Sequence, residues 1–365
     1  MSAASDFSSP RPTDEIVDVL IVGAGGSGAV VAWSLADTRM KILCLEQGDW
    51  VKPTEFPTNG DDWEARRYSD FHISPNRRAR EADYPINDDN SLIKVANFNG
   101  VGGGTILYMA HFPRMHPSDF RVRTLDGVAD DWPIDYWTLE PYFAANDRMM
   151  GVAGLTGDPS YPPHQPTMPP IPLGRSGVRY ARALNKLGWH WWPSETALAT
   201  VEHDGRAKCI NLGQCTLGCA QGAKASVDIT YWPHALRAKV ELRTRCRVRE
   251  IVTDEHGMAA GVVYYDANGL ERFQPAEEHL AARFANHVQI FITTEEVVGD
   301  QRAPVFELSG GAHFLHEVQA RFEVVAVAAV KIVVEEKHAA AFAGRENLLA
   351  NVIELVSFIT VAFGS

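Results

Sequence analysis

The stretch Gly23-Ala24-Gly25-Gly26-Ser27-Gly28 decides the fold of this chain. It follows the almost continuously apolar run 16–22, which is typical of a strand buried on both faces. Small and apolar side chains follow at helical spacing over residues 27–36, and Lys41–Glu46 has the character of a second strand. Together these segments predict a β-α-β unit of about 30 residues, whose right-handed crossover requires a parallel sheet.

Three glycines of this turn have separate mechanical roles. Gly23 permits a tight turn off the strand, Gly25 lets the backbone approach a pyrophosphate, and Gly28 allows the helix to pack closely on the strand. The start of the helix offers unpaired N–H groups and the positive end of its dipole to phosphates. We therefore predict that an adenine dinucleotide is bound by all four glycines of the turn: Gly23, Gly25, Gly26 and Gly28.

An acidic residue ends the second strand. Glu46 is placed to accept hydrogen bonds from a ribose diol, and its carboxylate would repel a 2′-phosphate, which disfavours NADP. A glycine-rich turn alone is weak evidence, because such turns are common. Here the turn lies after a strand, before a helix and about 20 residues before an acid, which favours dinucleotide binding over a plain turn.

Length, composition and charge limit the class of protein. The chain has 365 residues, 45% of them hydrophobic and 22% charged, as in globular proteins, and its length favours two domains over one. The formal net charge of −12 argues against a general nucleic-acid or anionic-membrane binder, because phosphate-rich partners are repelled at long range. Five cysteines are too few for a disulfide scaffold of this size.

Neither end of the chain predicts a targeting segment. Residues 1–15 are polar and lack the apolar segment of a signal peptide, so we expect a short disordered lead-in. The best candidate for a membrane span, 348–363, is interrupted by Asn351 and Glu354 and is too short. We therefore expect a cytoplasmic protein without a membrane span.

The residue composition and periodicity of the chain change several times after the first unit. Residues 50–175 are rich in Trp, Pro, Asp and Arg with few long periodic stretches, and the prolines of 159–172 indicate an extended connection. A helix is predicted over 176–188. The segments 240–252 and 258–265 have the character of strands around a turn at Glu255-His256-Gly257.

Further segments resemble the glucose–methanol–choline (GMC) family of FAD-dependent oxidoreductases. Val101-Gly102-Gly103-Gly104-Thr105 is similar to the family's second glycine-rich segment, which passes close to the flavin. The family often has Asn where Tyr108 stands here. Arg247–Ile251 resembles the strand that meets the adenine, with Val248 at the contact position. The other similar segments, in family order, are His111–Arg114, Asp131–Ile134, Leu139–Phe143, Gly151–Gly154 and Cys209–Ala235.

The resemblance covers residues 16–275 and implies an α/β fold. It implies a Rossmann-like FAD-binding domain with a parallel sheet, formed by 16–158 and return strands within 223–275, and a second, irregular α+β region. Residues 159–222 are then a connection and cap with a cysteine loop. FAD is the implied cofactor, held by the first turn and by Gly102, Gly103, Thr105 and Val248. The implied partners are a small alcohol or sugar and an electron acceptor.

The alternation of strands and helices also bears on the cofactor. An NAD enzyme needs strands and helices that alternate steadily through two mononucleotide-binding halves. Here the alternation stops after residue 48 and gives way to long irregular segments, which suit an enclosed flavin. FAD is therefore favoured over NAD.

The loop 209–222 contains three cysteines. Some related sugar dehydrogenases hold an iron–sulfur centre in this loop, which makes Cys209, Cys215 and Cys219 candidate ligands. A full cluster normally recruits four thiolates, so free thiols in a packed loop are the favoured interpretation, and no metal site is predicted. Lys224, just after the loop, is either a phosphate contact or part of a helix start, of which the second is commoner.

The resemblance ends at residue 275. The segment Glu277–Arg283 has a helical pattern, 288–293 and 322–334 have strand-like runs, and 335–355 can form a helix. These strands could complete the parallel sheet. Family members carry a catalytic His near the C-terminus in a His-x-x-Gly-Thr context, which is not found here, so the catalytic residue is unknown. None of the tail's histidines fits that context: His279, His287, His313, His316 and His338.

Three functions therefore stay open. The first is an FAD-dependent oxidoreductase that transfers hydride from an alcohol or sugar hydroxyl to flavin. The second is a non-catalytic FAD-binding remnant that has lost the catalytic His, and the third is an NAD-dependent dehydrogenase.

Overall fold

The computed structural model describes residues 14–293, apart from gaps at 58–59, 79, 81–82, 84–85, 93–94, 255–258 and 285–287. The strands are β1 (Val17–Val22), β2 (Ile42–Leu45), β3 (Glu241–Arg243), β4 (Arg247–Thr253), β5 (Ala259–Tyr265), β6 (Glu271–Phe284) and β7 (Val288–Thr293). The helices are α1 (Gly26–Leu35), α2 (Trp63–Arg67), α3 (Val122–Asp126), α4 (Tyr136–Met150), α5 (Arg175–Leu187) and α6 (Tyr231–Arg237). Short 3-10 helices are η1 (Pro53–Glu55), η3 (Gly103–Ile106) and η4 (Pro117–Arg121).

A seven-stranded sheet orders these strands as β3-β2-β1-β6-β5-β4, with β7 beside β6. The pairs β1–β2, β2–β3 and β1–β6 are parallel, and the remaining pairs are antiparallel. The strands of the first unit are buried almost throughout, as their continuous apolar runs predict. The predicted α/β fold with a parallel sheet at its centre is therefore confirmed, and so are the predicted helix at 176–188 and the strand at 288–293.

The predicted helical pattern of Glu277–Arg283 is wrong. This segment is the second half of β6, and it continues a strand whose first half pairs antiparallel with β5. From Ala276 onward β6 pairs parallel with β1, with Ala276 opposite Val17 and Ala282 opposite Val22. The open edge of β1 needs a partner for its backbone groups, and this non-local pairing overrides the local preference for helix.

The predicted strand 240–252 is two strands. Backbone N–H groups of Arg245 and Cys246 donate to the carbonyls of Gly48 (2.9 Å) and Glu46 (2.8 Å), so the chain between the two strands is still held to the end of β2. Arg245 adopts a positive φ of 57°, which turns the chain out of the parallel sheet and into the β4–β5 hairpin. The predicted turn at 255–257 and the predicted elements 322–334 and 335–355 lie outside the described residues.

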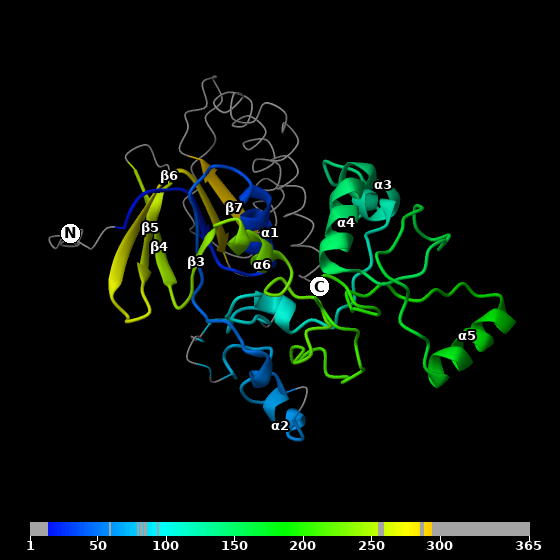
Figure 1. Cartoon of the computed structure of the whole chain (residues 1–365). Coiled ribbons are helices and arrows are strands. Elements are labelled where there is room, and N and C mark those ends of the chain that lie inside the picture. Colours follow the sequence, from blue (N-terminus) through cyan, green and yellow to red (C-terminus); the bar gives the residue numbers. More distant parts are fainter. Residues whose placement is uncertain are drawn as a thin grey trace.

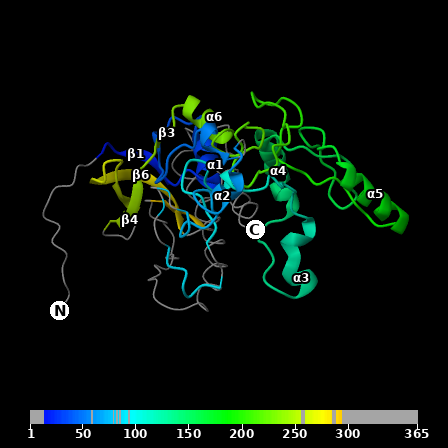
Figure 2. The same ribbon diagram turned by 90° about the horizontal axis from the view of Figure 1, so that it is seen from below.

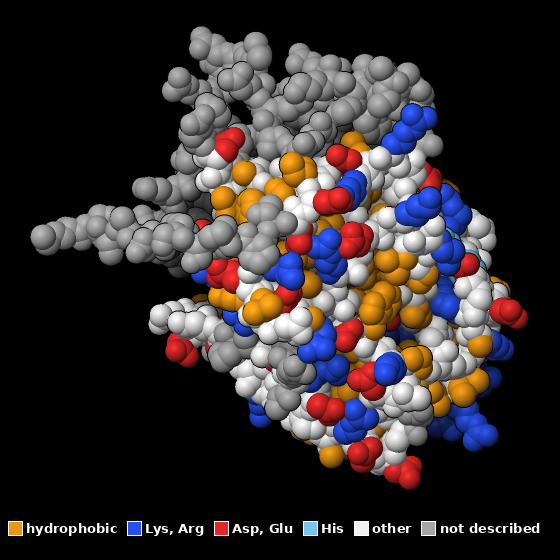
Figure 3. Space-filling model, turned by 60° about the vertical axis from the view of Figure 1, so that its left-hand side comes forward, with side chains coloured by type: hydrophobic (Ala, Val, Ile, Leu, Met, Phe, Trp, Pro, Cys, Tyr) orange, Lys and Arg blue, Asp and Glu red, His pale blue; other side chains and the backbone are white. Residues whose placement is uncertain are grey.

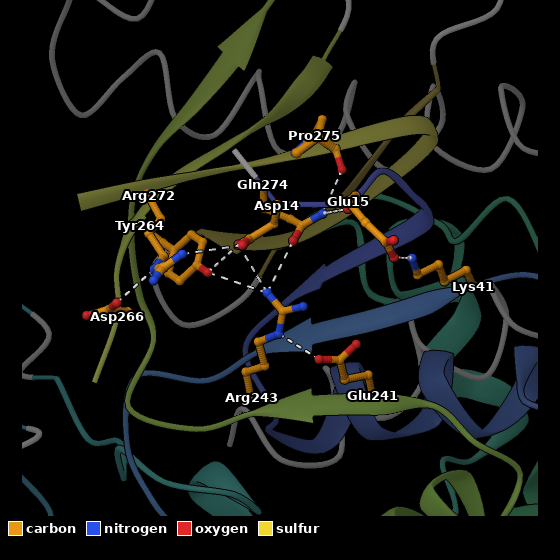
Figure 4. A network of polar contacts seen from close by, with 10 residues as sticks. All are labelled: Asp14, Glu15, Lys41, Glu241, Arg243, Tyr264, Asp266, Arg272, Gln274 and Pro275. Carbon is orange, nitrogen blue, oxygen red and sulfur yellow. Dashed lines mark hydrogen bonds and ion pairs between the residues drawn. The ribbon is translucent and has the colours of Figure 1, made fainter. Parts of the chain in front are cut away.

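The start of the described chain is tied to the hairpin and β6 (Figure 4). The Asp14 carboxylate accepts a hydrogen bond from the Tyr264 hydroxyl (2.6 Å) and pairs with Arg243 (3.1 Å) and Arg272 (3.6 Å). The Gln274 amide donates to the Glu15 carbonyl at 2.7 Å. These contacts hold the chain just before β1, at the end of the strand opposite to the glycine-rich turn.

The helices differ in how close to the sheet they lie. In Figures 1 and 2, α1 and α6 lie against the sheet, whereas α3, α4 and α5 lie away from it, with α5 farthest out. α1 and α6 pack through an edge-to-face contact of Trp33 and Tyr231, whose ring centroids are 5.4 Å apart. The main apolar core lies here, because α1 buries almost all its residues between strand and helix.

One face of the molecule shows no simple charge pattern. On the face shown in Figure 3, acidic and basic side chains are intermingled with apolar ones rather than gathered by sign. Among the described residues, no helix combines the length and apolar character needed to cross a bilayer.

Candidate cofactor-binding site

The first glycine-rich turn joins β1 to α1 in the geometry that the sequence predicts. Gly23 has a φ of +95°, which side-chain-bearing residues rarely adopt, and a Cβ there would meet no atom within 4 Å. Gly25 is the residue before α1, and no side chain caps the helix start or places an acid in its first turn. The start of this helix thus has no capping side chain and no nearby acid in its first turn, which suits an anionic ligand.

Gly28 is the closest packing point between α1 and the end of β1. A Cβ on Gly28 would lie 2.0 Å from the carbonyl oxygen of Gly23 and 3.3 Å from Cγ2 of Ile21. The first contact is with backbone, which cannot move aside without breaking the turn. This position therefore requires glycine, as predicted for the role of Gly28 in helix–strand packing.

Glu46 lies at the end of β2 with 5% of its surface exposed. One carboxylate oxygen accepts the N–H of Ala24 at 2.7 Å, and the other accepts the N–H of Gly48 at 2.8 Å. The side chain thus ties the glycine-rich turn to the end of the neighbouring strand. Its predicted contact with a ribose stays a prediction.

The second glycine-rich segment lies directly against the first. The Gly102 N–H donates to the carbonyl of Ala24 at 3.0 Å, and a Cβ on Gly103 would be 2.9 Å from the Cα of Gly25. Gly102 and Gly103 have φ of 104° and 51°. Two segments that are more than 70 residues apart in sequence (Ala24 and Gly102) therefore form one continuous glycine surface.

Trp232 of α6 completes this junction, although no motif in the sequence indicates a role for it. Its indole Nε1 donates to the same Ala24 carbonyl at 2.9 Å, and its side chain is fully buried. The tryptophan therefore fixes the middle of the first turn from behind. Only the three-dimensional packing of α6 on α1 brings it there.

The predicted contact residues Thr105 and Val248 have clear structural positions. The Thr105 hydroxyl donates to the Gly102 carbonyl (2.6 Å) and accepts the N–H of Val227 (3.1 Å), so it stabilises the second segment from within. Val248 is half-buried in β4 and packs on an apolar cluster that includes Leu45, the residue before Glu46. Contacts of either residue with a cofactor stay predictions.

The two segments fit the dinucleotide that the sequence predicts. Cβ atoms on Gly23 and Gly104 would meet nothing within 4 Å, so open space adjoins the first turn and the second segment. The opening at Gly23 lies in the turn that leads directly into α1. Narrow backbone surfaces without side chains, next to a helix N-terminus, match the shape and charge of a pyrophosphate.

The cysteine loop shows three free, half-buried thiols, Cys209, Cys215 and Cys219. Burial raises the pKa of the Cys215 thiol. Within the described residues, no group of three or more His, Cys, Asp or Glu side chains is arranged to hold a metal ion. These contacts do not test the iron–sulfur hypothesis, which stays the alternative to the favoured interpretation of free thiols.

A second polar cluster, which sequence reasoning missed, lies in the region of α4. The Arg114 guanidinium donates through Nε and Nη2 to the Asp147 carboxylate (2.9 and 2.7 Å), and both side chains are buried. Nearby, His164 Nε2 pairs with the Glu195 carboxylate at 2.6 Å, and His164 Nδ1 faces the Pro162 carbonyl at 2.9 Å. No sequence spacing links these residues, because they come from four separate segments.

The His164–Glu195 pair gives the protein a pH-dependent term in its stability. The hydrogen bond with Glu195 raises the pKa of His164 above its ordinary 6.5, and both ring nitrogens face acceptors, so the imidazolium form is favoured. Because the folded-state pKa is raised, this stabilisation is complete below the unfolded value and is lost as pH rises through the folded one.

We expect Glu195→Gln to lower the free energy of unfolding by about 1 kcal/mol at pH 6, because a charge-assisted hydrogen bond is lost. The difference should shrink as pH rises towards 8.5, which urea denaturation at both pH values measures. His234→Gln is the control, since the His234–Asp204 pair is far more exposed. If Glu195→Gln lowers the free energy of unfolding by the same amount at both pH values, this assignment is contradicted.

Comparisons with known proteins bear on this site. Residues 176–285 match the family model described as GMC oxidoreductase. The chain is 40% identical over 253 residues to the 2-methyl-1,2-propanediol dehydrogenase of Mycolicibacterium austroafricanum, covering 68% of this chain and 45% of that protein. It is 28% identical to the fructose dehydrogenase large subunit of Gluconobacter japonicus, covering 56% of this chain and 41% of that protein. A structure of formate oxidase matches with a TM-score of 0.45 and 15% identity, over 75% of this chain and 46% of its own.

The chain thus spans about half the length of the curated relatives it matches. The resemblance stated from the sequence is confirmed for this part. Over the segment that these comparisons cover, the chain belongs to the GMC oxidoreductase family.

Proposed function

We propose that this chain binds FAD and contributes to oxidation of an alcohol or sugar hydroxyl. The observation that carries the proposal is the junction at Ala24, where the two glycine-rich segments meet beside the uncapped start of α1. The named relatives, a diol dehydrogenase and a fructose dehydrogenase subunit, support the substrate class. The chain covers less than half of each of these two relatives, so the substrate class is itself part of what we propose.

In this proposal, the chain's own residues bind and orient the cofactor. The amides at the start of α1 and the bare backbone of Gly23 and Gly25 hold the pyrophosphate, and Glu46 accepts from the adenosine ribose. Gly102, Gly103 and Thr105 form the surface beside the flavin, and Val248 contacts the adenine. Bound FAD supplies the hydride acceptor, which no protein side chain can provide.

The base that removes the hydroxyl proton is not assigned. Of the tail's histidines, His279 is the one that falls in a described element, within β6 and opposite Val19 of β1. The positions 287, 313, 316 and 338 lie outside the described residues. We therefore keep the FAD-binding, non-catalytic protein as the second candidate, favoured by the same glycine junction.

The first test is the visible spectrum of the protein purified and reconstituted with FAD. Flavin absorbance that stays with the protein on gel filtration supports both FAD candidates. A colourless protein that retains NAD instead overturns them in favour of the dehydrogenase alternative. Anaerobic bleaching of bound flavin by 2-methyl-1,2-propanediol, fructose or primary alcohols indicates the oxidoreductase, whereas a flavin that no member of the panel bleaches indicates the non-catalytic protein.

Iron and acid-labile sulfide analysis of anaerobically purified protein tests whether the cysteine loop holds an iron–sulfur cluster.

Gly104→Leu tests the location of the cofactor. Gly104 is exposed, has no positive φ, and its Cβ direction is open, so we expect apoprotein stability to change by less than about 0.5 kcal/mol. If FAD fills the open space, its affinity should fall at least about tenfold, since a leucine side chain would occupy the same volume. Fluorescence titration with FAD measures this. Unchanged affinity in a stable variant places the flavin elsewhere.

A further inference from the structure

Lys224 is a buried cation directly behind the second glycine-rich segment. Its side chain is 1% exposed, and its ammonium Nζ donates to the carbonyls of Ile106 (2.7 Å), Tyr108 (2.9 Å) and Thr105 (3.3 Å). It also lies 4.8 Å from the centre of the Tyr108 ring. The prediction of a phosphate contact or a helix start at Lys224 therefore does not describe its position: it bonds to the carbonyl end of η3, and the next helix, α6, starts at Tyr231.

Three backbone carbonyls satisfy the hydrogen bonds of this ammonium, and within the described part of the chain no anion is bonded to it. A buried cation of this kind is expensive, because carbonyl dipoles replace only part of the hydration it loses. Consistent with that cost, burial lowers the pKa of Lys224 to about 8. A neutral side chain such as Gln could donate to carbonyls without that penalty, so the charge itself calls for an explanation.

A buried anion lies on the same segment. Asp228 is 6% exposed, and its Oδ1 has no hydrogen-bond partner among the described residues. This oxygen lies beside Gly102, 3.1 Å from where a Cβ on that glycine would stand. Burial raises the pKa of Asp228 to about 6. The segment from Gly102 to Tyr108 thus has a buried cation and a buried anion behind it, and neither is bonded directly to the other in the described contacts.

We propose that the buried charges of Lys224 and Asp228 shift the reduction potential of the flavin in opposite directions. This inference rests on the proposed function, which puts FAD beside Gly102–Thr105. Reduction of FAD adds negative charge to the site, so a nearby cation stabilises the reduced form and a nearby anion destabilises it. In a buried site these effects are only weakly screened by salt.

The experiment separates charge from hydrogen bonding. The two-electron midpoint potential of bound FAD is measured at pH 7, where Lys224 is protonated and Asp228 ionised, in wild type and in Lys224→Gln, Lys224→Met and Asp228→Asn. Lys224→Gln keeps amide donors for the carbonyls and loses the charge, whereas Lys224→Met loses both. Lys208→Gln, which removes an exposed lysine just before the cysteine loop, is the matched control.

Both Lys224 variants should lower the reduction equilibrium constant by at least about tenfold, which is about 30 mV for a two-electron couple. Asp228→Asn should shift the potential in the opposite direction, and Lys208→Gln should leave it unchanged. If Lys224 acts only through its hydrogen bonds to the three carbonyls, the expected result differs. Lys224→Met would then lose FAD affinity, whereas Lys224→Gln would keep the wild-type potential. That outcome overturns the proposal.

Two further results keep the test decisive. If the Lys224 variants fail to fold, the midpoint potential of Asp228→Asn decides the test. A potential equal to that of wild type then rejects the role of the buried charges. If wild-type protein binds no FAD, the proposed function itself fails, which the absorbance spectrum shows before any potential is measured. FAD dissociation constants of each variant, obtained in the same titrations, show whether the site remains formed.

Discussion

Gly28→Ala is expected to abolish FAD binding and to lower the free energy of unfolding by at least about 3 kcal/mol. The added methyl group would lie 2.0 Å from the Gly23 carbonyl oxygen, a distance that no pair of non-bonded heavy atoms can hold. Relief requires α1 to move away from β1. That movement separates the helix start from the turn and disrupts the buried face of α1, which makes up much of the main core.

The two effects of Gly28→Ala are measured separately. Urea denaturation followed by tryptophan fluorescence gives the stability of the apoprotein, and FAD titration gives the affinity. Gly104→Ala is the control for stability, because it also adds one methyl group to a glycine of the site but meets no atom within 4 Å. A Gly28→Ala variant as stable as Gly104→Ala would show that the packing of α1 on β1 is looser than these distances indicate.

The first β-α-β unit could be predicted because its information is local. The continuous apolar runs, the spacing of three glycines and the acid at the end of β2 all lie within residues 16–46 and point to one arrangement. The structure places Gly23 and Gly28 in the conformations and contacts that their predicted roles require. Local agreement of this kind needs no knowledge of the rest of the chain.

β6 could not be predicted because its information is non-local. Its sequence from Glu277 to Arg283 favours helix by composition, yet it pairs with β1, from which more than 250 residues separate it. The edge of β1 supplies a row of backbone groups that only a strand can satisfy, and this decides the outcome. The local sequence pattern of residues 277–283 contains no information about the strand with which they pair.

The buried polar residues of the site show the same division. Lys224 has the residue type of a phosphate ligand, and the sequence left this role open beside the commoner one of a helix start. Its actual partners are three carbonyls of residues 105, 106 and 108, more than 110 positions away. Trp232 likewise matters through a single hydrogen bond to Ala24, which depends on how α6 packs on α1. Residue type indicates what a side chain can bind, whereas burial decides which partner it meets.

Arg114→Met is expected to cost about 3–5 kcal/mol at pH 8, the range typical of removing one partner of a buried ion pair. Arg114 and Asp147 have side chains that are 2% and 5% exposed, so the variant leaves a carboxylate buried without its guanidinium. Methionine fills much of the vacated volume, which limits the effect to the lost charge and hydrogen bonds. Glu140→Gln is the matched control, because Glu140 pairs with the same guanidinium but is 33% exposed, and its loss should cost less than about 1 kcal/mol.

The cost of Arg114→Met should depend on pH in a defined direction. Burial raises the pKa of Asp147 to about 6 in the wild type, and the Arg114 guanidinium opposes that rise, so removing it raises the pKa further. A carboxyl group whose folded pKa lies above its unfolded value of 3.8 loses stability as pH rises through the folded pKa. The deficit of the variant should therefore be smallest near pH 5, where Asp147 is protonated, and should widen towards pH 8. Urea denaturation across this range measures it, and Arg114→Met/Asp147→Asn should recover part of the loss at pH 8 because no charge is then left buried. A deficit that is constant with pH, or a double variant no more stable than Arg114→Met, would mean that the guanidinium acts by packing on Phe143 rather than by neutralising Asp147.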